Sequence, residues 1–525
     1  MLVDGGIANN LPINQARQLC GDVIIAVNIS TPALLRKDLT SALAVALQLV
    51  NFLGKNTVDE QLKSLGPGDV LIEPDLGNIS AASFDQSKEA IQIGAAATHK
   101  LAGSLSRYSL PPEQYAAFQA RQVASAKELG TVAEIRFEGL ARTNPDVLRS
   151  MIETKPGEPL SEVTINNDLQ KIYGRGDFEG VNYRILGDAG PRAMVITPTE
   201  KSWGPDYLRF GLGLATDFQG DNQFNVLVQY RKSWINQLGG EWLTEVQVGQ
   251  DTHLFSEWYQ PLNDGRVWFG SLYGVVGQTT RGVFNGDDQI ATYLIGSARA
   301  GVDLGATFGT TGAIRIGPQW TQVDARVDVG DPVLPSVKEL TAGGRVAFVI
   351  DQLNHPWFPE EGYAANVNYY GASTALGSAI NYQRLQANGN FAFSWGSNTI
   401  NLYAAGGTDF NSNMPAYESF ALGGPLRLSG FRLNQFSGHE FAFARAMYYR
   451  RIFPLPDLLG SGVYAGASAE VGNIRARSDS LLPSSGTLYS GSVFLGANTF
   501  AGPAFFGAGL GTGNAFSLYL LLGVP

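Results

Sequence analysis

Leu208-Arg209-Phe210-Gly211-Leu212-Gly213-Leu214-Ala215 is the stretch of sequence that decides the fold. Every second position holds a large apolar side chain, and the positions between hold Arg, Gly or Ala. A period of two is typical of a β-strand whose two faces meet different surroundings. The same alternation recurs along the chain and ends it, in Phe516-Ser517-Leu518-Tyr519-Leu520. Residues 206–525 are therefore predicted to consist mainly of strands.

The length and number of these runs predict the type of sheet. A run of about ten residues rises about 33 Å, and a tilt of about 40° leaves about 25 Å of height. That height matches the apolar band of an outer-membrane barrel. We count roughly sixteen runs, an even number, as an up-and-down antiparallel barrel requires. The predicted fold class is mainly β: a transmembrane β-barrel of about sixteen strands, with apolar side chains facing lipid.

The composition supports a membrane barrel over a soluble all-β domain. Only 16% of the residues are charged, well below the roughly 25% of a soluble domain. Aromatic residues make up 11%, with 20 Tyr and 8 Trp, and these types prefer the lipid–water boundary. A soluble domain that buries its apolar faces inward is the alternative. It does not account for the low charge or for aromatic residues at the ends of the runs.

Several classes of function and site are not expected. The net charge of −10 gives no basic footprint for nucleic acid. A single cysteine, Cys20, allows no internal disulfide, and the four histidines are scattered, so we expect no metal site and no cofactor. No secretion signal precedes Asp4, and no apolar run reaches the length of a spanning helix.

The chain begins with a different kind of sequence. Asp4-Gly5-Gly6-Ile7-Ala8-Asn9-Asn10-Leu11-Pro12 is followed by the apolar run Val23–Ile29. This stretch resembles the Asp-Gly-Gly/Ala block of patatin-like phospholipases, which hydrolyse acyl esters with a Ser–Asp dyad. The resemblance implies that Asp4 is the general base and that Gly5 and Gly6 shape its turn. A plain Asp-Gly-Gly turn is the alternative.

The nucleophile of such a dyad is missing from this sequence. No Gly-x-Ser-x-Gly motif occurs; residues 371–375 and 466–470 come nearest, and both fail at the last position. Residues 1–129 are therefore predicted to be the C-terminal part of a patatin-like α/β domain. Its Ser would lie upstream, outside this sequence.

A compact β-α-α-β-β unit is predicted for residues 131–202. The expected elements are a strand over 132–139, helices from Asn144 and over Glu162–Tyr173, and strands over 178–185 and 193–197. The unit resembles a polypeptide-transport-associated (POTRA) domain, including the junction Ile172-Tyr173-Gly174-x-Gly176-x-Phe178. Another small α+β domain is the alternative.

A long insertion, Asp409–Gly438, interrupts the barrel pattern. Its Leu428-Ser429-Gly430-Phe431 resembles the tip of the loop that folds into the lumen in barrels of the bacterial surface antigen superfamily. Ser429 stands where that family usually has Arg, so Arg427 or Arg432 is expected to supply the positive charge. The acidic partner implied by the resemblance is Glu470, in Glu470-Val471-Gly472. A Glu470 that is merely solvated in the lumen is the alternative.

The order of the three parts resembles patatin-like phospholipases fused to an outer-membrane barrel. This implies phospholipid hydrolysis in the intact architecture, with the barrel as anchor in the outer membrane of a Gram-negative-type bacterium. The N-terminal domains are expected in the periplasm. Expected partners are membrane lipid, the outer-membrane insertion machinery and a second copy of the chain. A non-catalytic barrel that translocates or assembles polypeptides, and a degenerate gene product without function, are the alternatives.

The missing nucleophile generates a prediction for the purified chain. Loss of a catalytic Ser costs about 10⁶ in turnover, so the chain is expected to show no esterase activity above that of an Asp4→Ala variant. Hydrolysis of a chromogenic acyl ester measures this. Turnover that disappears in Asp4→Ala would show that a nucleophile is present after all.

Overall fold

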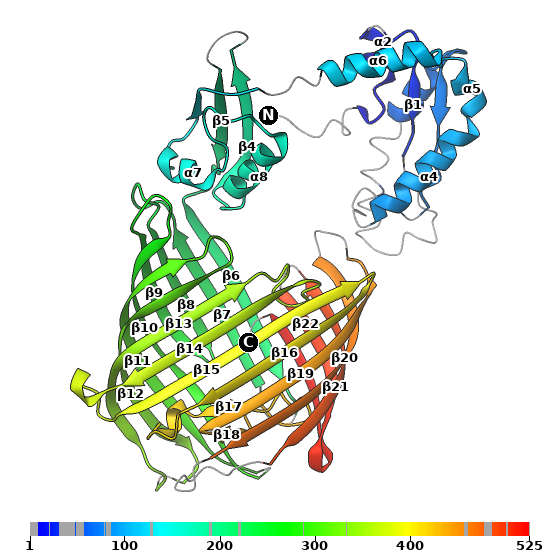
Figure 1. Ribbon diagram of the computed structural model, residues 1–525. Helices are drawn as coiled ribbons and strands as arrows, with labels where there is room; N and C mark the ends of the chain where they lie inside the picture. The colour runs from blue at the N-terminus through cyan, green and yellow to red at the C-terminus, as the bar shows by residue number, and fades with distance from the viewer. Residues whose placement is uncertain are drawn as a thin grey trace. The chain divides into compact units, whose positions relative to one another are not determined.

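The structure is a computed structural model. It describes residues 9–19, 21–30, 48, 57–77, 79, 86–125, 130–187, 192–218, 222–286, 288–331, 333–455, 460–476, 486–499 and 502–523. The chain divides into two compact units, Met1–Lys127 and Glu128–Pro525. The second unit contains a small α+β domain and a barrel (Figure 1).

The first unit is of the α/β type. Strands β1 (Ile25–Val27) and β2 (Val70–Ile72) pair in parallel. The described helices around them are α2 (Ile13–Gln18), α4 (Ser87–Lys100), α5 (Ala102–Ser106) and α6 (Pro112–Ser125). Backbone amides of Gly66 and Ile24 donate to the Asp69 carboxylate and lower the pKa of Asp69. The carboxylate thereby ties the residues before β1 to the turn before β2.

The small domain has the predicted β-α-α-β-β order. Its elements are β3 (Glu134–Phe137), α7 (Pro145–Met151), α8 (Glu162–Tyr173), β4 (Phe178–Leu186) and β5 (Ala193–Glu200). The sheet order is β3-β5-β4, with β3 parallel and β4 antiparallel to β5. Side chains from both helices and the sheet form one core, which includes Ile135, Leu148, Ile165, Phe178 and Ile196.

A buried carboxylate fastens the connection between the two helices of this domain. Asp168 on α8 is 1% exposed. It accepts hydrogen bonds from the backbone amides of Glu153 (2.8 Å) and Thr154 (2.9 Å) and from the Thr154 hydroxyl (2.6 Å). Lys171 lies 3.9 Å from the same carboxylate. A buried carboxylate is tolerated here because its oxygens are hydrogen-bonded.

The described strands of the remaining sequence close into a sixteen-stranded antiparallel barrel, as predicted. Figure 1 shows the strands strongly tilted across the barrel wall. The strands are β6 (Asp206–Thr216), β7 (Asn222–Lys232), β8 (Glu241–Gly249), β9 (Thr252–Pro261), β10 (Trp268–Asn285), β11 (Asp288–Thr307), β12 (Gly312–Val329), β13 (Val337–Asp351), β14 (Gly362–Ala372), β15 (Tyr382–Trp395), β16 (Asn398–Thr408), β19 (Glu440–Phe453), β20 (Gly460–Arg475), β21 (Leu488–Thr499), β22 (Gly502–Gly511) and β23 (Ala515–Gly523). Short 3-10 turns lie at η3 (Thr374–Leu376) and η5 (Thr512–Asn514).

The two faces of the wall have the predicted polarity. On β6, Leu208 is 62% exposed and Phe210 is 77% exposed on the outer surface. On β11, Val302 and Leu304 are exposed, whereas Asp303 between them is completely buried inside. Apolar side chains therefore face outward, as in a barrel surrounded by lipid.

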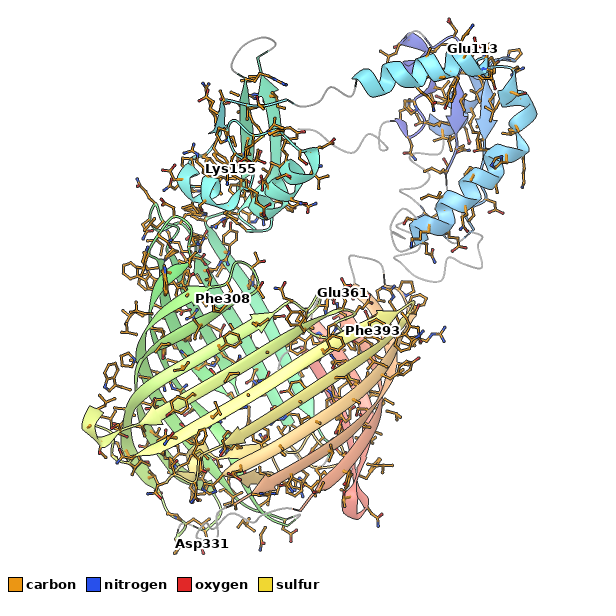
Figure 2. The ribbon with its side chains drawn as sticks, in the orientation of Figure 1. Glu113, Lys155, Phe308, Asp331, Glu361 and Phe393 are labelled. Carbon is orange, nitrogen blue, oxygen red and sulfur yellow. The ribbon has the colours of Figure 1, made fainter. Side chains whose placement is uncertain are left out.

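Exposed aromatic side chains gather near one rim of the barrel. Phe308 and Glu361 lie at this rim, Phe393 lies on the outer face close to it, and Asp331 lies at the opposite rim (Figure 2). The Phe308 ring is 48% exposed and the Phe393 ring 56%. Exposed aromatic side chains at this level are typical of the lipid–water boundary.

Residues 409–438, here called the inward segment, leave the wall between β16 and β19. They contain η4 (Ala416–Glu418) and a short hairpin of β17 (Phe420–Leu422) and β18 (Phe436–Gly438). Their apolar side chains pack on inward-facing residues of the wall: Leu422 and Leu428 are fully buried in a cluster with Phe441 and Ile474. The segment therefore occupies part of the lumen.

The Asp168 contacts generate a prediction for the small domain. Asp168→Ala leaves the amides of Glu153 and Thr154 buried without acceptors, which costs about 1–3 kcal/mol. Hydrogen exchange of these amides in the full chain should accelerate accordingly. The matched control is Asp146→Ala, because Asp146 is exposed and pairs only with Arg149 on the surface, which is worth about 0–1 kcal/mol. Equal exchange in both variants would contradict the role given to Asp168.

Candidate functional site

The tip of the inward segment is bound to the wall through Glu470 on β20. The carboxylate is 3% exposed and accepts the backbone amides of Leu428 (2.8 Å) and Ser429 (2.6 Å). It also accepts the hydroxyls of Ser429 (2.7 Å) and Ser468 (2.6 Å). Leu428 has a left-handed backbone, with φ of 78°, which turns successive amides toward one anion.

The expected pairing of Glu470 with Arg427 or Arg432 is wrong. Arg427 donates to the carbonyl of Ala421, and the Arg432 guanidinium lies over the Phe284 ring. Among the described residues, backbone amides and hydroxyls fill the places that a guanidinium would take. Ser429 carries no charge, but its hydroxyl reaches the carboxylate, and the turn of the backbone brings the amides of Leu428 and Ser429 to it as well.

Two further residues lie beside this contact. The alternation along β20 predicts that Ser468 lies on the same face as Glu470, although its hydrogen bond was not expected. Arg445, in contrast, was not predicted from the sequence. Arg445 is paired with Glu470 across β19 and β20. It donates to the Leu426 carbonyl at 3.1 Å and to Asn401 at 3.2 Å. Only the register of the strands places Arg445 beneath the tip.

Glycines make room for the tip on the wall. A Cβ at Gly430 would lie 2.3 Å from the backbone nitrogen of Gly511 on β22. A Cβ at Gly509 would lie 2.1 Å from the carbonyl oxygen of Ser429. The Gly430 amide donates to Ser490 on β21 at 2.8 Å. The tip therefore lies backbone to backbone on β21 and β22, which a side chain at either glycine would prevent.

The other end of the inward segment is held by a different part of the wall. Arg281 on β10 donates to the carbonyls of Tyr417 (3.4 Å) and Ser419 (3.2 Å). Arg384 on β15 donates to the Glu418 carbonyl at 3.1 Å, and the Tyr417 hydroxyl donates to Glu339 on β13. The segment is thus tied to β10–β15 at one end and to β19–β22 at the other.

The barrel closes at an unusually short seam. Strands β6 and β23 share four registered pairs, Leu520↔Thr216 to Gly523↔Gly213. On its other edge β6 pairs with β7 over its whole length, from Asp206↔Lys232 to Thr216↔Asn222. Residues 206–212 of β6 consequently have no described strand partner at the seam edge. Unpaired backbone N–H and C=O groups at such an edge can form hydrogen bonds with an added strand.

The small domain contacts the barrel rim at the turn between β7 and β8. The Trp234 indole donates to Asp177 at 3.1 Å, and the Arg175 guanidinium lies 4.9 Å from the ring centre of Trp234. Arg175 and Asp177 pair at 3.1 Å. Burial, and then the nearby Arg266, lower the pKa of Arg175. A second contact joins the Ser150 hydroxyl to the Asp264 carbonyl at 3.0 Å.

The sequence also predicts a general base and its turn near the start of the chain. Asp4, Gly5 and Gly6 fall outside the described residues. Of the helices that the structure describes, none has the length and apolar character needed to cross a membrane. Within the same residues, His, Cys, Asp and Glu side chains form no group of three that would hold a metal ion.

Comparison with known proteins identifies two regions of the chain. Residues 211–472 match the Omp85 superfamily domain. Residues 130–197 match the surface antigen variable number repeat, the POTRA family. The chain is also similar to the outer membrane protein assembly factor BamA of Nitratidesulfovibrio vulgaris, with 27% identity over 70 residues. That match covers 13% of this chain and only 9% of the relative.

Solved structures show the same fold at low sequence identity. BamA from Haemophilus ducreyi lacking POTRA domains 1–3 superposes with a TM-score of 0.57 at 14% identity, covering 75% of this chain and 84% of that one. CdiB from Escherichia coli superposes with a TM-score of 0.53 at 17% identity, covering 76% of each chain. The chain therefore contains a barrel domain of the Omp85 superfamily and a POTRA domain, an arrangement that indicates the outer membrane with the POTRA domain in the periplasm.

Proposed function

We propose that this protein inserts or translocates polypeptides at the outer membrane, with the β6–β23 seam as the place where a client strand enters. The short seam is the observation that carries the proposal. Among the described residues, four pairs join β6 to β23, whereas every other ladder of the barrel wall contains more pairs. An exposed strand edge binds an added strand through main-chain hydrogen bonds, so β6 is suited to receive one.

The comparisons favour this role over lipid hydrolysis. The matched families cover the POTRA domain and the barrel from residue 211 to residue 472, and the BamA relative is described as an assembly factor. A periplasmic POTRA domain fastened to the rim through Trp234 and Asp177 would present a client near the start of β6. Expected partners are therefore an unfolded polypeptide and the outer-membrane insertion machinery.

Acyl-ester hydrolysis is the second candidate function. It rests on the sequence Asp4-Gly5-Gly6 and on the α/β character of the first unit, in which β1 and β2 are parallel. In that case the barrel would anchor a hydrolase whose Ser is supplied by sequence outside this chain. Addition of a patatin-type N-terminal half, followed by an Asp4-dependent esterase assay, tests this reading.

The seam generates a prediction for cross-linking. Ala215→Cys with Leu521→Cys places two thiols at a directly registered pair of β6 and β23, in a Cys20→Ser background. The oxidised protein should lose at least about tenfold in the rate at which it folds a reporter barrel into proteoliposomes. Reduction should restore the rate, because a disulfide holds only the oxidised seam closed.

The matched control is Ala404→Cys with Ala444→Cys in the same Cys20→Ser background, a registered pair of β16 and β19 that involves neither strand of the seam. Its oxidation should leave reporter folding unchanged. Full activity of the seam-cross-linked protein would overturn the proposal that clients use this edge.

The contacts of Glu470 generate a second prediction, that this residue holds the tip of the inward segment. Glu470→Ala leaves the amides of Leu428 and Ser429 without acceptors, at a cost of about 1–3 kcal/mol. Trypsin cleavage after Arg427 or Arg432 should accelerate by at least about fivefold. The control is Glu440→Ala, since Glu440 accepts one described hydrogen bond, from Thr408. If both variants resist trypsin as the parent does, Glu470 does not hold the tip.

A further inference from the structure

An apolar cavity lies between the inward segment and the inner wall of the barrel. Its volume is about 440 Å³, within the range of small-molecule sites. The wall contributes apolar side chains from β10, β11, β12 and β13, and six residues of the inward segment also line the cavity, among them Pro415 and Ala416. The members used below are Val283, Ile295, Ala325, Val337, Pro415 and Ala416. The interior of such barrels is ordinarily polar, and apolar cavities in proteins hold apolar ligands rather than water.

A second cavity with a different character adjoins the first. Its volume is about 840 Å³. Arg281, Ile295 and Tyr417 line both cavities, so they form the boundary between them. Four further guanidinium groups line the larger cavity, those of Arg299, Arg315, Arg345 and Arg384. An apolar chamber therefore adjoins one lined by several guanidinium groups.

Most of these guanidinium groups have a carboxylate partner. Arg315 pairs with Glu257, Arg345 with Asp303 at 2.9 Å and Arg384 with Glu418 at 3.7 Å. The carboxylate of Glu245, which also lines the cavity, faces His253 at 3.0 Å. The Asp251 carboxylate accepts the Thr279 hydroxyl.

Two guanidinium groups are left without a carboxylate among the described residues. Arg299 donates through Nε to the Thr321 hydroxyl at 3.3 Å. Arg281 donates through Nη1 to the inward segment, at the Tyr417 and Ser419 carbonyls and the Ser419 hydroxyl. The remaining donors of both groups are available for an anion. A charged hydrogen bond at a partly buried site is stronger than one in water.

We propose that the two cavities together bind a single-tailed amphiphile with an anionic head. The tail fills the chamber around Ile295 and Ala325, and the carboxylate or phosphate head meets Arg281 and Arg299. The inward segment covers the tail through Pro415 and Ala416, so an occupied site holds this end of the segment against the wall. This binding site is independent of the polypeptide role proposed above.

Equilibrium binding of radiolabelled dodecanoate to the full chain in amphipol tests the site, with empty amphipol as blank. Dodecanoate should bind saturably. Ala325→Trp fills the apolar chamber and should weaken binding at least tenfold. The matched control is Ala298→Trp on the outer face of β11, exposed to lipid, which should bind dodecanoate as the parent does. Heat-modifiable migration in gels reports whether each variant is a closed barrel.

A second variant tests the head group. Arg299→Gln should weaken dodecanoate by about tenfold, the loss of one charged hydrogen bond, and leave uncharged dodecanol unchanged. It spares the inward segment, because the described bond of Arg299 goes to the wall. If the Ala325→Trp variant does not form a closed barrel, the comparison of dodecanoate with dodecanol in Arg299→Gln tests the proposed site instead. Dodecyl phosphate in parallel distinguishes a lipid phosphate from a free fatty acid as the source.

Three outcomes would overturn the inference. The first is no saturable dodecanoate binding to the parent. The second is equal binding by closed Ala325→Trp and Ala298→Trp. The third is an Arg299→Gln variant that loses dodecanol and dodecanoate alike or neither of them.

Discussion

Hydrogen bonding of the backbone inside a bilayer is the constraint on which the rest of the structure depends. Hydrocarbon offers no water to an unpaired amide or carbonyl, so a sheet that crosses it must close on itself. Along most of the wall this is achieved by full-length ladders, such as that of β6 with β7. The four described pairs of β6 with β23 form the junction of the barrel wall that needs the least free energy to separate. The unpaired backbone groups of β6 make the pairing of β6 with β23 weak, and the same groups can form hydrogen bonds with a new strand. The seam is therefore the structural basis of the proposed function.

The inward segment is held at both ends by hydrogen bonds to its backbone, together with several to its side chains. Glu470 is buried, and it is stable there because amides of Leu428 and Ser429 and two hydroxyls satisfy it. At the other end, guanidinium groups of Arg281 and Arg384 bind carbonyls of residues 417–419. The segment therefore joins the wall that flanks the seam to the wall opposite. It lines both the charged cavity and the apolar one, and the common boundary of the two cavities is the proposed amphiphile site.

Much of the architecture follows from local patterns. The alternation of Leu208, Phe210 and Leu212 with small or polar residues predicts strand, face and environment together, because side chains of a strand point to opposite faces in turn. The helix over Glu162–Tyr173 and the β-α-α-β-β order of elements along the small domain were also predicted, since caps and periodicity are properties of neighbouring residues. The comparisons agree with the barrel and the POTRA domain, and they favour the translocation alternative over the phospholipase that the Asp4 motif suggested.

The sequence by itself determined the sixteen-stranded barrel, its outward apolar face, the POTRA domain and the identity of Glu470 as an inward carboxylate. Only the tertiary structure decided what Glu470 binds: Ser429 and its neighbours lie 41 and 42 residues away, and the donors are backbone amides, which every residue other than proline carries. The contact of Arg281 with Tyr417 joins residues 136 positions apart, and the seam joins the first and last strands of the barrel. Such contacts depend on the register of many strands at once, which no local pattern of side chains encodes.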